Sequence, residues 1–278
     1  MKNFRLFLPA LLAAALCMLI GFSANAETEG IYTYSVVNEQ ATITRISPEN
    51  SDPITIPDTL GGYPVTTLGN SILSSSAYTV AEVVIPEGIE HIYDITFNTA
   101  KLKYITVDEN NPEYCSVNGV LLDKVQTTLI NCPPNYTYEV FNVPATVKTI
   151  GKYAFSNAKI LKTVQLPEGL LTLGDQAFAF TDSIEHIELP QTLETIEGNC
   201  FAYNDGIREI VIPQNVTSFG TSVFTDCHNL QTAVILANIN TIPTWAFDNN
   251  QSLKTVVLPE TVTEIASLEE SLKQLQAA

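Results

Sequence analysis

Three side chains near the middle of the chain, His186, Glu188 and Glu209, have residue types that support acid–base or metal chemistry. His186 and Glu188 are two positions apart, so an extended strand would place both on one face. Glu209 follows His186 by 23 residues, which is the period of a repeat described below. An imidazole beside two carboxylates could transfer protons or hold a cation. A solvated group on a sheet surface would have the same residues, and we favour this second interpretation.

The rest of the sequence offers no catalytic arrangement. His91 and His228 fall at other phases of the repeat, so the three histidines do not converge. The sequence has no phosphate-binding glycine loop, no H-E-x-x-H and no nucleophile elbow. We therefore predict a protein that is not an enzyme and has no catalytic residues, no cofactor and no metal site. The alternative is a secreted hydrolase that uses the group of His186, Glu188 and Glu209.

Four cysteines follow the N-terminal segment, and a secreted protein could join them in disulfides. Cys200 occupies a repeat position that holds Ala154 in another copy, which is typical of a small buried side chain. Two bridges stay open at this point: Cys115 to Cys132, which flank an expected hairpin, and Cys200 to Cys227. The cysteine spacings match no zinc site.

A repeated phrase of 23 residues has to position these side chains. In the copy at residues 161–178, apolar Leu161, Val164 and Leu166 precede Pro167, and the pair Ala177-Phe178 ends the copy. The same residue types return at the same interval, so that the phrase fills residues 144–259. A fixed period in the twenties marks a solenoid, whose units stack because none of them buries its apolar face alone.

Each copy is expected to form one coil. Its three apolar positions point inward from a short strand, and the proline ends the strand because it has no N–H to donate. Strands of successive coils should pair in parallel, about 4.8 Å apart. We expect the phenylalanines to stack as a buried spine on the side opposite the strands. These are Phe97, Phe155, Phe178, Phe201, Phe224 and Phe247.

The outward positions of the strands form the predicted binding face. In the last three coils one outward row should hold valines, beside a row that contains threonines. A contiguous exposed apolar strip is typical of an interface, although valine also favours a sheet face through its β-propensity alone. The predicted ligand-binding residues are Val211, Val234, Val257, Thr232, Thr255, His186, Glu188 and Glu209.

The segments that flank the repeats have separate roles. Residues 1–26 have the basic start, apolar run and Ala24-Asn25-Ala26 cleavage site of a secretory signal peptide. A lipoprotein anchor at Cys17 is the alternative. Residues 27–50 alternate around a turn and are expected to form an N-terminal capping hairpin. The solenoid should span residues 51–265, with an inserted hairpin at about 109–143, and residues 266–278 should form a C-terminal capping helix.

The charge of the chain limits its partners. The formal net charge is −17, and the signal peptide carries two basic residues and no acidic ones, so the mature chain is more acidic still. Nucleic acids and anionic membrane surfaces would repel such a chain. We expect a monomer that does not insert into a membrane. A row of basic residues, which could bind a ligand or offset neighbouring acids, consists of Lys103, Lys162, Arg208 and Lys254.

The phrase L-x-x-V-x-L-P-x-x-L-x-x-L-G-x-x-A-F at residues 161–178 resembles the BspA-like bacterial leucine-rich repeat. The insertion, with Asn111-Pro112-Glu113-Tyr114 and Val117-Asn118-Gly119-Val120-Leu121, is similar to the interrupted repeat of that family. The resemblance covers about residues 30–265. The sequence departs from the pattern at Glu197-Gly198 and at Leu236, where the expected glycine and proline are absent, and we expect two looser turns there.

We therefore predict a leucine-rich repeat solenoid, β-rich with short parallel strands and short helical turns, wound as a right-handed superhelix. The resemblance implies secreted or surface proteins that bind surface molecules of a host or of bacteria, and it implies no catalytic residues. The expected function is that of a secreted or cell-surface binding or adhesion protein. Such a protein would recognise another protein or a cell-surface polymer through its strand face.

Overall fold

The computed structural model describes residues 26–49, 53–73, 79–97 and 101–266. The expected signal peptide, the alternative anchor at Cys17 and the expected C-terminal helix lie outside these ranges, apart from Ala26 and Ala266. The described residues form 23 strands and no helix. It follows that no helix in this part of the chain is long and apolar enough to cross a membrane.

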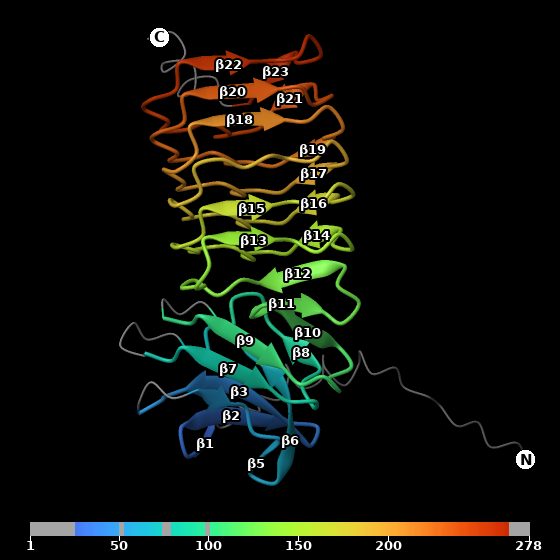
Figure 1. Cartoon of the computed structure of the whole chain (residues 1–278), viewed down its shortest axis with the longest axis vertical. Helices are drawn as coiled ribbons and strands as arrows, with labels where there is room; N and C mark the ends of the chain where they lie inside the picture. Colours follow the sequence, from blue (N-terminus) through green and yellow to red (C-terminus); the bar gives the residue numbers. More distant parts are fainter. Residues whose placement is uncertain (1–25, 50–52, 74–78, 98–100, 267–278) are drawn as a thin grey trace, which may run out of the picture.

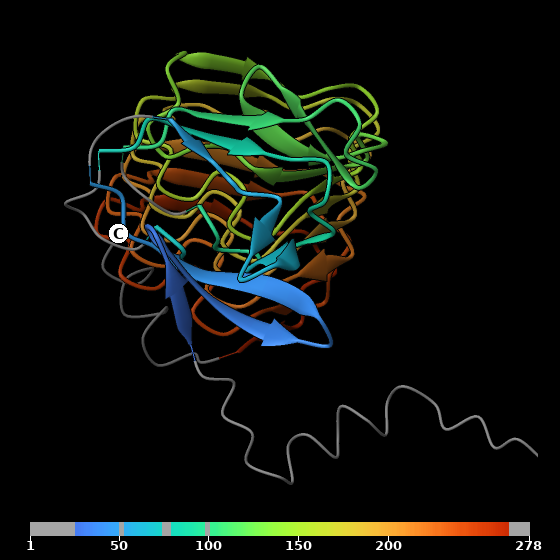
Figure 2. The same ribbon diagram turned by 90° about the horizontal axis from the view of Figure 1, so that it is seen from below.

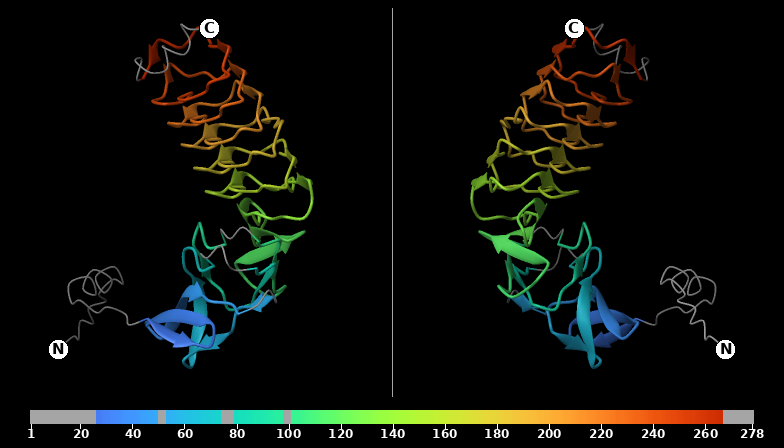
Figure 3. Two further views of the ribbon diagram at one scale, coloured as in Figure 1. Left: turned by 90° about the vertical axis from the view of Figure 1, so that its left-hand side faces the viewer. Right: turned by 90° about the vertical axis from the view of Figure 1, so that its right-hand side faces the viewer.

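The chain is a β-solenoid of about nine turns. Its coils stack along the long axis of the molecule, from the N-terminal end in blue to the C-terminal end in red (Figure 1). Viewed from the side, the stack follows an arc rather than a straight line (Figure 3). Each regular coil contributes to three walls, which we name the first-strand wall, the second-strand wall and the turn wall.

The first-strand wall contains the strand that precedes the repeat proline or its equivalent. Its strands are β4 (Ile54–Thr55), β7 (Glu82–Ile85), β9 (Tyr104–Val107), β13 (Val140–Asn142), β15 (Thr163–Gln165), β18 (Glu209–Ile212), β20 (Thr232–Ile235) and β22 (Thr255–Val257). They pair in parallel within three separate ladders, β4-β7-β9, β13-β15 and β18-β20-β22. The predicted short parallel strands are therefore present.

The second-strand wall contains the strand that follows in each coil. Its strands are β6 (Tyr63–Leu68), β8 (His91–Ile92), β12 (Thr128–Asn131), β14 (Thr149–Ile150), β16 (Thr172–Leu173), β17 (Thr195–Ile196), β19 (Ser218–Phe219), β21 (Thr241–Ile242) and β23 (Glu264–Ile265). The longest ladder in this wall runs β12-β14-β16-β17-β19, and each of its pairs is parallel.

The turn wall consists of residues 151–158 and their equivalents in later coils, where short helical turns were expected. Helix does not form here because Tyr153 and Asn157 adopt left-handed backbone conformations, with φ of 58° and 64°. The N–H groups of Tyr153, Phe155 and Asn157 then point along the solenoid. They donate to carbonyls of the next coil at 3.0, 2.8 and 3.1 Å. A helix would have used these donors within its own coil.

The predicted phenylalanine spine is confirmed for the five regular coils. Neighbouring rings from Phe155 to Phe247 have centroids 5.0–5.5 Å apart and planes within 10° of each other. All five side chains are buried. The prediction for Phe97 was wrong: this residue is buried in a separate N-terminal core, and Phe141 takes the place next to Phe155, with centroids 6.2 Å apart.

The inserted segment divides the interior in two. Strand β10 (Tyr114–Val117) pairs antiparallel with β11 (Val120–Asp123), and β11 pairs antiparallel with β12, which rejoins the parallel array. Successive side chains of a strand point to opposite faces. Accordingly, Leu121 packs into the N-terminal core, whereas Val120 and Leu122 pack into the C-terminal core. The hydrophobic interior is therefore two clusters that meet at β11.

The N-terminal end of the stack is closed by β1 (Glu27–Glu29), β2 (Tyr32–Val37) and β3 (Gln40–Ile46), which pair antiparallel. Strand β3 pairs in parallel with β6, and so joins this small sheet to the first coil. Strand β5 (Thr59–Leu60) makes a short antiparallel pair with β6. In Figure 2, which looks from the N-terminal end, these blue strands lie in front of the coils.

All four cysteines of the described residues are free thiols, so neither of the two bridges left open by the sequence is present. The Sγ atom of Cys227 instead donates to the carbonyl of Phe201 at 3.1 Å, and that of Cys115 donates to the carbonyl of Asp123 at 3.2 Å. Burial raises the pKa of the Cys227 thiol to about 12, because the interior disfavours the thiolate. Cys200 and Cys132 are fully buried core side chains.

Candidate binding surface

Strands β18, β20 and β22 place the predicted apolar and threonine rows side by side. Val211 pairs with Val234 and Val234 with Val257, all in parallel register. The same register aligns Glu209 with Thr232 and Thr232 with Thr255. Val211 and Val257 are 49% and 46% exposed, and Val234 is half-buried. The valines therefore form one contiguous apolar strip on the first-strand wall.

Leu236 extends this strip and was not among the predicted binding residues. It follows β20 at an outward position and is 48% exposed. The turn at Leu236 was expected to be loose because proline is absent, and this expectation was wrong. Unlike proline, Leu236 has an N–H group, which donates to the carbonyl of Ile212 at 2.9 Å. The missing proline was thus the sequence signal for a longer ladder and a wider apolar strip.

The first-strand wall is interrupted at residues 184–189. Main-chain hydrogen bonds join β13 to β15 and join β18, β20 and β22, but within the described residues none links 184–189 to β15 or β18. The apolar side chains of this segment still point inward, and Ile184 and Ile187 are buried. Its outward positions carry His186 and Glu188, and glutamate is depleted in strands.

A hollow of about 450 Å³ lies at this interruption and brings the predicted polar residues together. The Nε2 atom of His186 is 3.3 Å from Oε1 of Glu188, and the two side chains are 73% and 90% exposed. Glu209 lines the same hollow, as does Val211 from the apolar strip. The remaining lining residues are Leu166, Glu168, Ile187, Leu189, Pro190 and Gln191.

The geometry of this hollow suits binding better than catalysis. Its histidine and glutamates are open to water, which weakens electrostatic effects on a reacting group. Across the described ranges, no group of three or more histidine, cysteine, aspartate or glutamate side chains could hold a metal ion. The predicted row of basic residues is partly offset by acids. Lys162, one member of that row, forms a salt bridge of 2.7 Å with Glu139.

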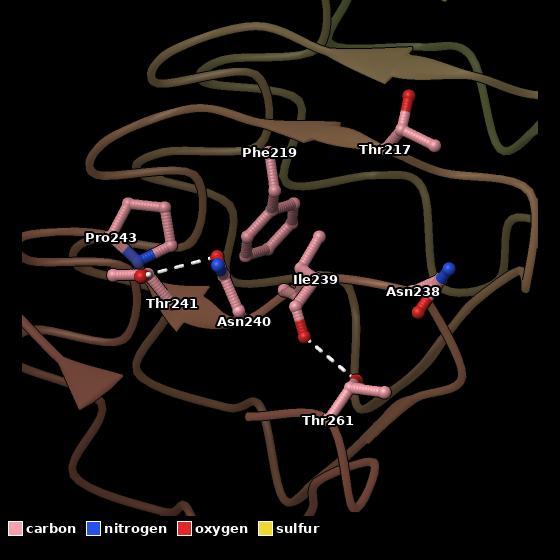
Figure 4. A pocket seen from close by; sticks show the side chains of 8 residues that line it. All are labelled: Thr217, Phe219, Asn238, Ile239, Asn240, Thr241, Pro243 and Thr261. Atoms are coloured by element: carbon pink, nitrogen blue, oxygen red, sulfur yellow. Dashed lines mark hydrogen bonds between the residues drawn. The ribbon is translucent and has the colours of Figure 1, made fainter. Parts of the chain in front are cut away.

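A second hollow, of about 460 Å³, lies on the second-strand wall where the ladder breaks between β19 and β21 (Figure 4). Pro243 is the equivalent of Gly220 in the preceding coil. The N–H of Gly220 donates to the carbonyl of Ile196, whereas proline has no N–H and cannot make this bond. The hollow has an uncharged lining that includes Phe219, Asn240 and Thr261. Thr261 is held there by a 2.8 Å hydrogen bond to the carbonyl of Ile239 (Figure 4).

A third hollow, of about 440 Å³, lies where β9 and β13 are not paired. It is lined by Asn118 at the tip of the inserted hairpin and by residues 138–142, including the exposed Tyr138 and Val140. All three hollows therefore lie at breaks in the main-chain ladders. Of the three, only the one at residues 184–189 adjoins the valine strip.

One family model matches this sequence. It describes a BspA type leucine-rich repeat region and matches in six copies, over residues 49–118, 131–254 and 224–268. The internal gap between the matched ranges, residues 119–130, holds β11, the turn after it and most of β12. No functionally curated protein matches the sequence.

Two solved structures share the fold. The pneumococcal vaccine antigen PcpA is 20% identical, with a TM-score of 0.58 over 91% of this chain and 96% of that one. A leucine-rich repeat protein from Eubacterium ventriosum is 28% identical, with a TM-score of 0.51 over 77% of this chain and 54% of that one. The chain therefore corresponds to about half of the Eubacterium structure. Neither match, nor the family model, indicates an enzyme.

Proposed function

Because this chain belongs to the BspA-type leucine-rich repeat family, we propose that it is a binding protein that recognises another protein or a cell-surface polymer through its first-strand wall. The observation that carries this proposal is the strip made by the in-register valines Val211, Val234 and Val257 and extended by Leu236. These side chains are large and apolar, and three of them are close to half exposed. Exposed apolar side chains that adjoin one another are typical of an interaction site.

The hollow at residues 184–189 supports the same surface. Val211 belongs to both the strip and the hollow, so one ligand could contact apolar side chains and the polar group of His186, Glu188 and Glu209 together. The apolar contacts would supply most of the affinity, and the polar rim would orient the ligand. Thr232 and Thr255 border the strip and add hydroxyl groups to this surface.

We also infer that the protein is secreted or displayed on the cell surface, that the signal peptide is removed near Ala26 and that the mature chain is a monomer. The basic start, the apolar run and the small residues at positions 24–26 support the secretion route. The net charge of −17 supports protein or polymer ligands over nucleic acid. Sequencing the N-terminus of the exported protein tests the cleavage position, and mass measurement in solution tests the monomer.

The binding surface is tested by replacing the three valines of β18, β20 and β22 together with threonine. Threonine keeps the β-branched shape that suits a strand but replaces a methyl group with a hydroxyl. Labelled wild-type protein and the V211T/V234T/V257T variant are compared for binding to panels of intact bacterial and animal cells by flow cytometry. We expect the variant to lose most of the signal on every cell type that the wild type binds.

The control is V37T/V125T, because Val37 and Val125 are 54% and 70% exposed and lie outside the first-strand wall. The control should bind as the wild type does. Undiminished binding by V211T/V234T/V257T, or an equal loss in the control, would contradict the proposal.

A further inference from the structure

Two exposed aromatic side chains, Phe180 and Tyr203, stack on each other at the end of the turn wall. Their ring centroids are 4.6 Å apart and their planes differ by 1°. Phe180 is 39% exposed and Tyr203 is 46% exposed, so this pair lies outside the buried phenylalanine spine. The two residues belong to adjacent coils, and the stack therefore runs along the solenoid axis.

The backbone gives no reason for aromatic residues at this position. Phe180 and Tyr203 have φ of 60° and 59°, in the left-handed region that bulky residues rarely adopt. The equivalent positions of the other regular coils hold Asn157, Asp226 and Asn249, residue types that tolerate this region well. Strained residues persist where the surrounding structure holds them, and they cluster at functional sites. The exposed pair therefore points to a ligand that contacts aromatic faces.

A row of carboxylates runs beside the aromatic pair. Asp182 and Asp205 each follow an aromatic residue by two positions. The N–H of Asp205 donates to Oδ1 of Asp182 at 3.2 Å, and the N–H of His228 donates to Oδ1 of Asp205 at 2.9 Å. These bonds stack the acidic side chains along the solenoid. Asp226 is the equivalent of Phe180 and Tyr203 in the next coil, so it continues the row of the aromatic pair.

These carboxylates keep hydrogen-bonding capacity. Oδ1 of Asp226 accepts from Asn249, and His228 lies 2.9 Å from Oδ1 of Asp205 and 3.8 Å from Oδ1 of Asp226. Within the described residues, the Oδ2 atoms of Asp182, Asp205 and Asp226 have no hydrogen-bond partner. A carboxylate accepts through both oxygens, so each of these three side chains keeps an acceptor atom that the chain does not use.

A similar combination of an aromatic ring and a carboxylate occurs elsewhere in the protein, where it contacts a lysine. Lys152 lies 5.1 Å from the centroid of the Tyr153 ring and forms a 3.1 Å salt bridge with Asp175. There, a cation, an aromatic face and a carboxylate are satisfied within the chain. The Phe180–Tyr203 pair has aromatic faces and carboxylates, but no lysine or arginine contacts them within the described ranges. His228 lies against Asp205 and Asp226, but no lysine or arginine in the described ranges combines with the pair as Lys152 does with Tyr153.

We propose that Phe180 and Tyr203, together with Asp205 and Asp226, bind an arginine side chain from a basic segment of a partner protein. The guanidinium plane would stack on the Tyr203 face that is turned towards the coil of Asp226. Its N–H groups would donate to the free Oδ2 atoms. Arginine fits better than lysine, because a planar fork stacks and donates at once, whereas an ammonium group does not stack. This site is on a different wall from the valine strip and is independent of it.

The test compares two peptides of equal charge, fluorescein-labelled hexa-arginine and hexa-lysine, in titrations of the purified chain at about 0.15 M salt. We expect hexa-arginine to bind roughly 3- to 30-fold more tightly, which is the range expected for one stacked cation. In F180N/Y203N this preference should vanish, because hexa-arginine falls to the affinity of hexa-lysine. Asparagine is the residue type that other coils use here, so the variant should fold. D205N/D226N should weaken both peptides.

The control variant is Y93N/Y138N, because these tyrosines are 54% and 55% exposed and lie away from the pair. It should keep the arginine preference of the wild type. Equal affinity for both peptides in the wild type would overturn the proposal, since the binding would then follow charge alone. A preference that survives in F180N/Y203N would also overturn it. A neutral oligosaccharide that binds the wild type but not F180N/Y203N, where hexa-arginine shows no preference, would assign the pair to a sugar instead.

Discussion

The turn wall and the first-strand wall are built from the same coils, yet only the turn wall is continuous. From the coil of Phe155 to that of Phe247, every junction of the turn wall has three main-chain hydrogen bonds. The first-strand wall loses its ladder at residues 184–189 and between β9 and β13. The turn wall has the stacked phenylalanines directly behind it, whereas the first-strand wall has, apart from Phe141, aliphatic side chains of varied size.

The comparison indicates that the turn wall fixes how the coils stack, whereas the outward side chains of the first-strand wall are free to vary. In the turn wall, left-handed residues direct the main-chain donors along the solenoid, so that coil spacing and hydrogen bonding are set together. In the first-strand wall, outward side chains face solvent and can change without loss of the core. Both proposed binding sites accordingly use outward side chains, of the first-strand wall or of the end of the turn wall.

The largest expected effect is on the spine. Replacing Phe201 with alanine should lower the free energy of unfolding by about 3–5 kcal/mol, because it removes a fully buried ring and leaves a cavity between two stacked neighbours. Urea unfolding measures this loss. The matched change is Phe180→Asn, at the exposed pair, which should alter stability by no more than about 0.5 kcal/mol. A large loss in Phe180→Asn would show that the exposed pair is structural, and would weaken its assignment to a ligand.

A smaller effect is expected where coils approach most closely. At Gly220, a Cβ atom would lie 2.4 Å from the main-chain nitrogen of Gly198. Gly220→Ala should therefore displace one coil from the next and lower the free energy of unfolding by about 1–3 kcal/mol. At Gly88, the nearest atom to a new Cβ would be the carbonyl oxygen of Val65 at 3.7 Å, an ordinary contact. Gly88→Ala should therefore leave the melting temperature nearly unchanged. Equal losses in the two variants would contradict the close approach at Gly220.

The smallest expected effect is on the ladder of the first-strand wall. Leu236→Pro restores the residue type found in most coils but removes the N–H that donates to Ile212, so it should cost about 1 kcal/mol. Leu236→Ala keeps the N–H and removes only exposed apolar surface, so its unfolding temperature should be close to that of the wild type. Thermal unfolding of the three proteins checks this order. A proline variant as stable as the alanine variant would mean that this hydrogen bond adds nothing.

The alignment of the candidate surface was predictable because its residues occupy two outward phases of the repeat. The register that aligns Val211, Val234 and Val257 follows from a period of 23 residues with no insertion between them. Two other departures from the repeat pattern were misread or went unnoticed. Leu236 was taken to loosen a turn, and Phe180 and Tyr203 stand in a phase that otherwise holds Asn157 and similar residues. At Leu236 the departure marks an added hydrogen bond, and at Phe180 and Tyr203 it marks the exposed pair that we propose as a binding site.

The sequence by itself determined the period, the parallel short strands, the burial of the five phenylalanines and the alignment of the outward rows. These follow from residue type and spacing, because each coil must bury the same positions against its neighbours. Only the tertiary structure decided that the turns are not helical, that β11 divides the core, that the cysteines stay unbridged and that the ladders open beside three hollows. Those features depend on small displacements between adjacent coils, which set whether a donor reaches its acceptor, and a pattern of residue types does not encode such displacements.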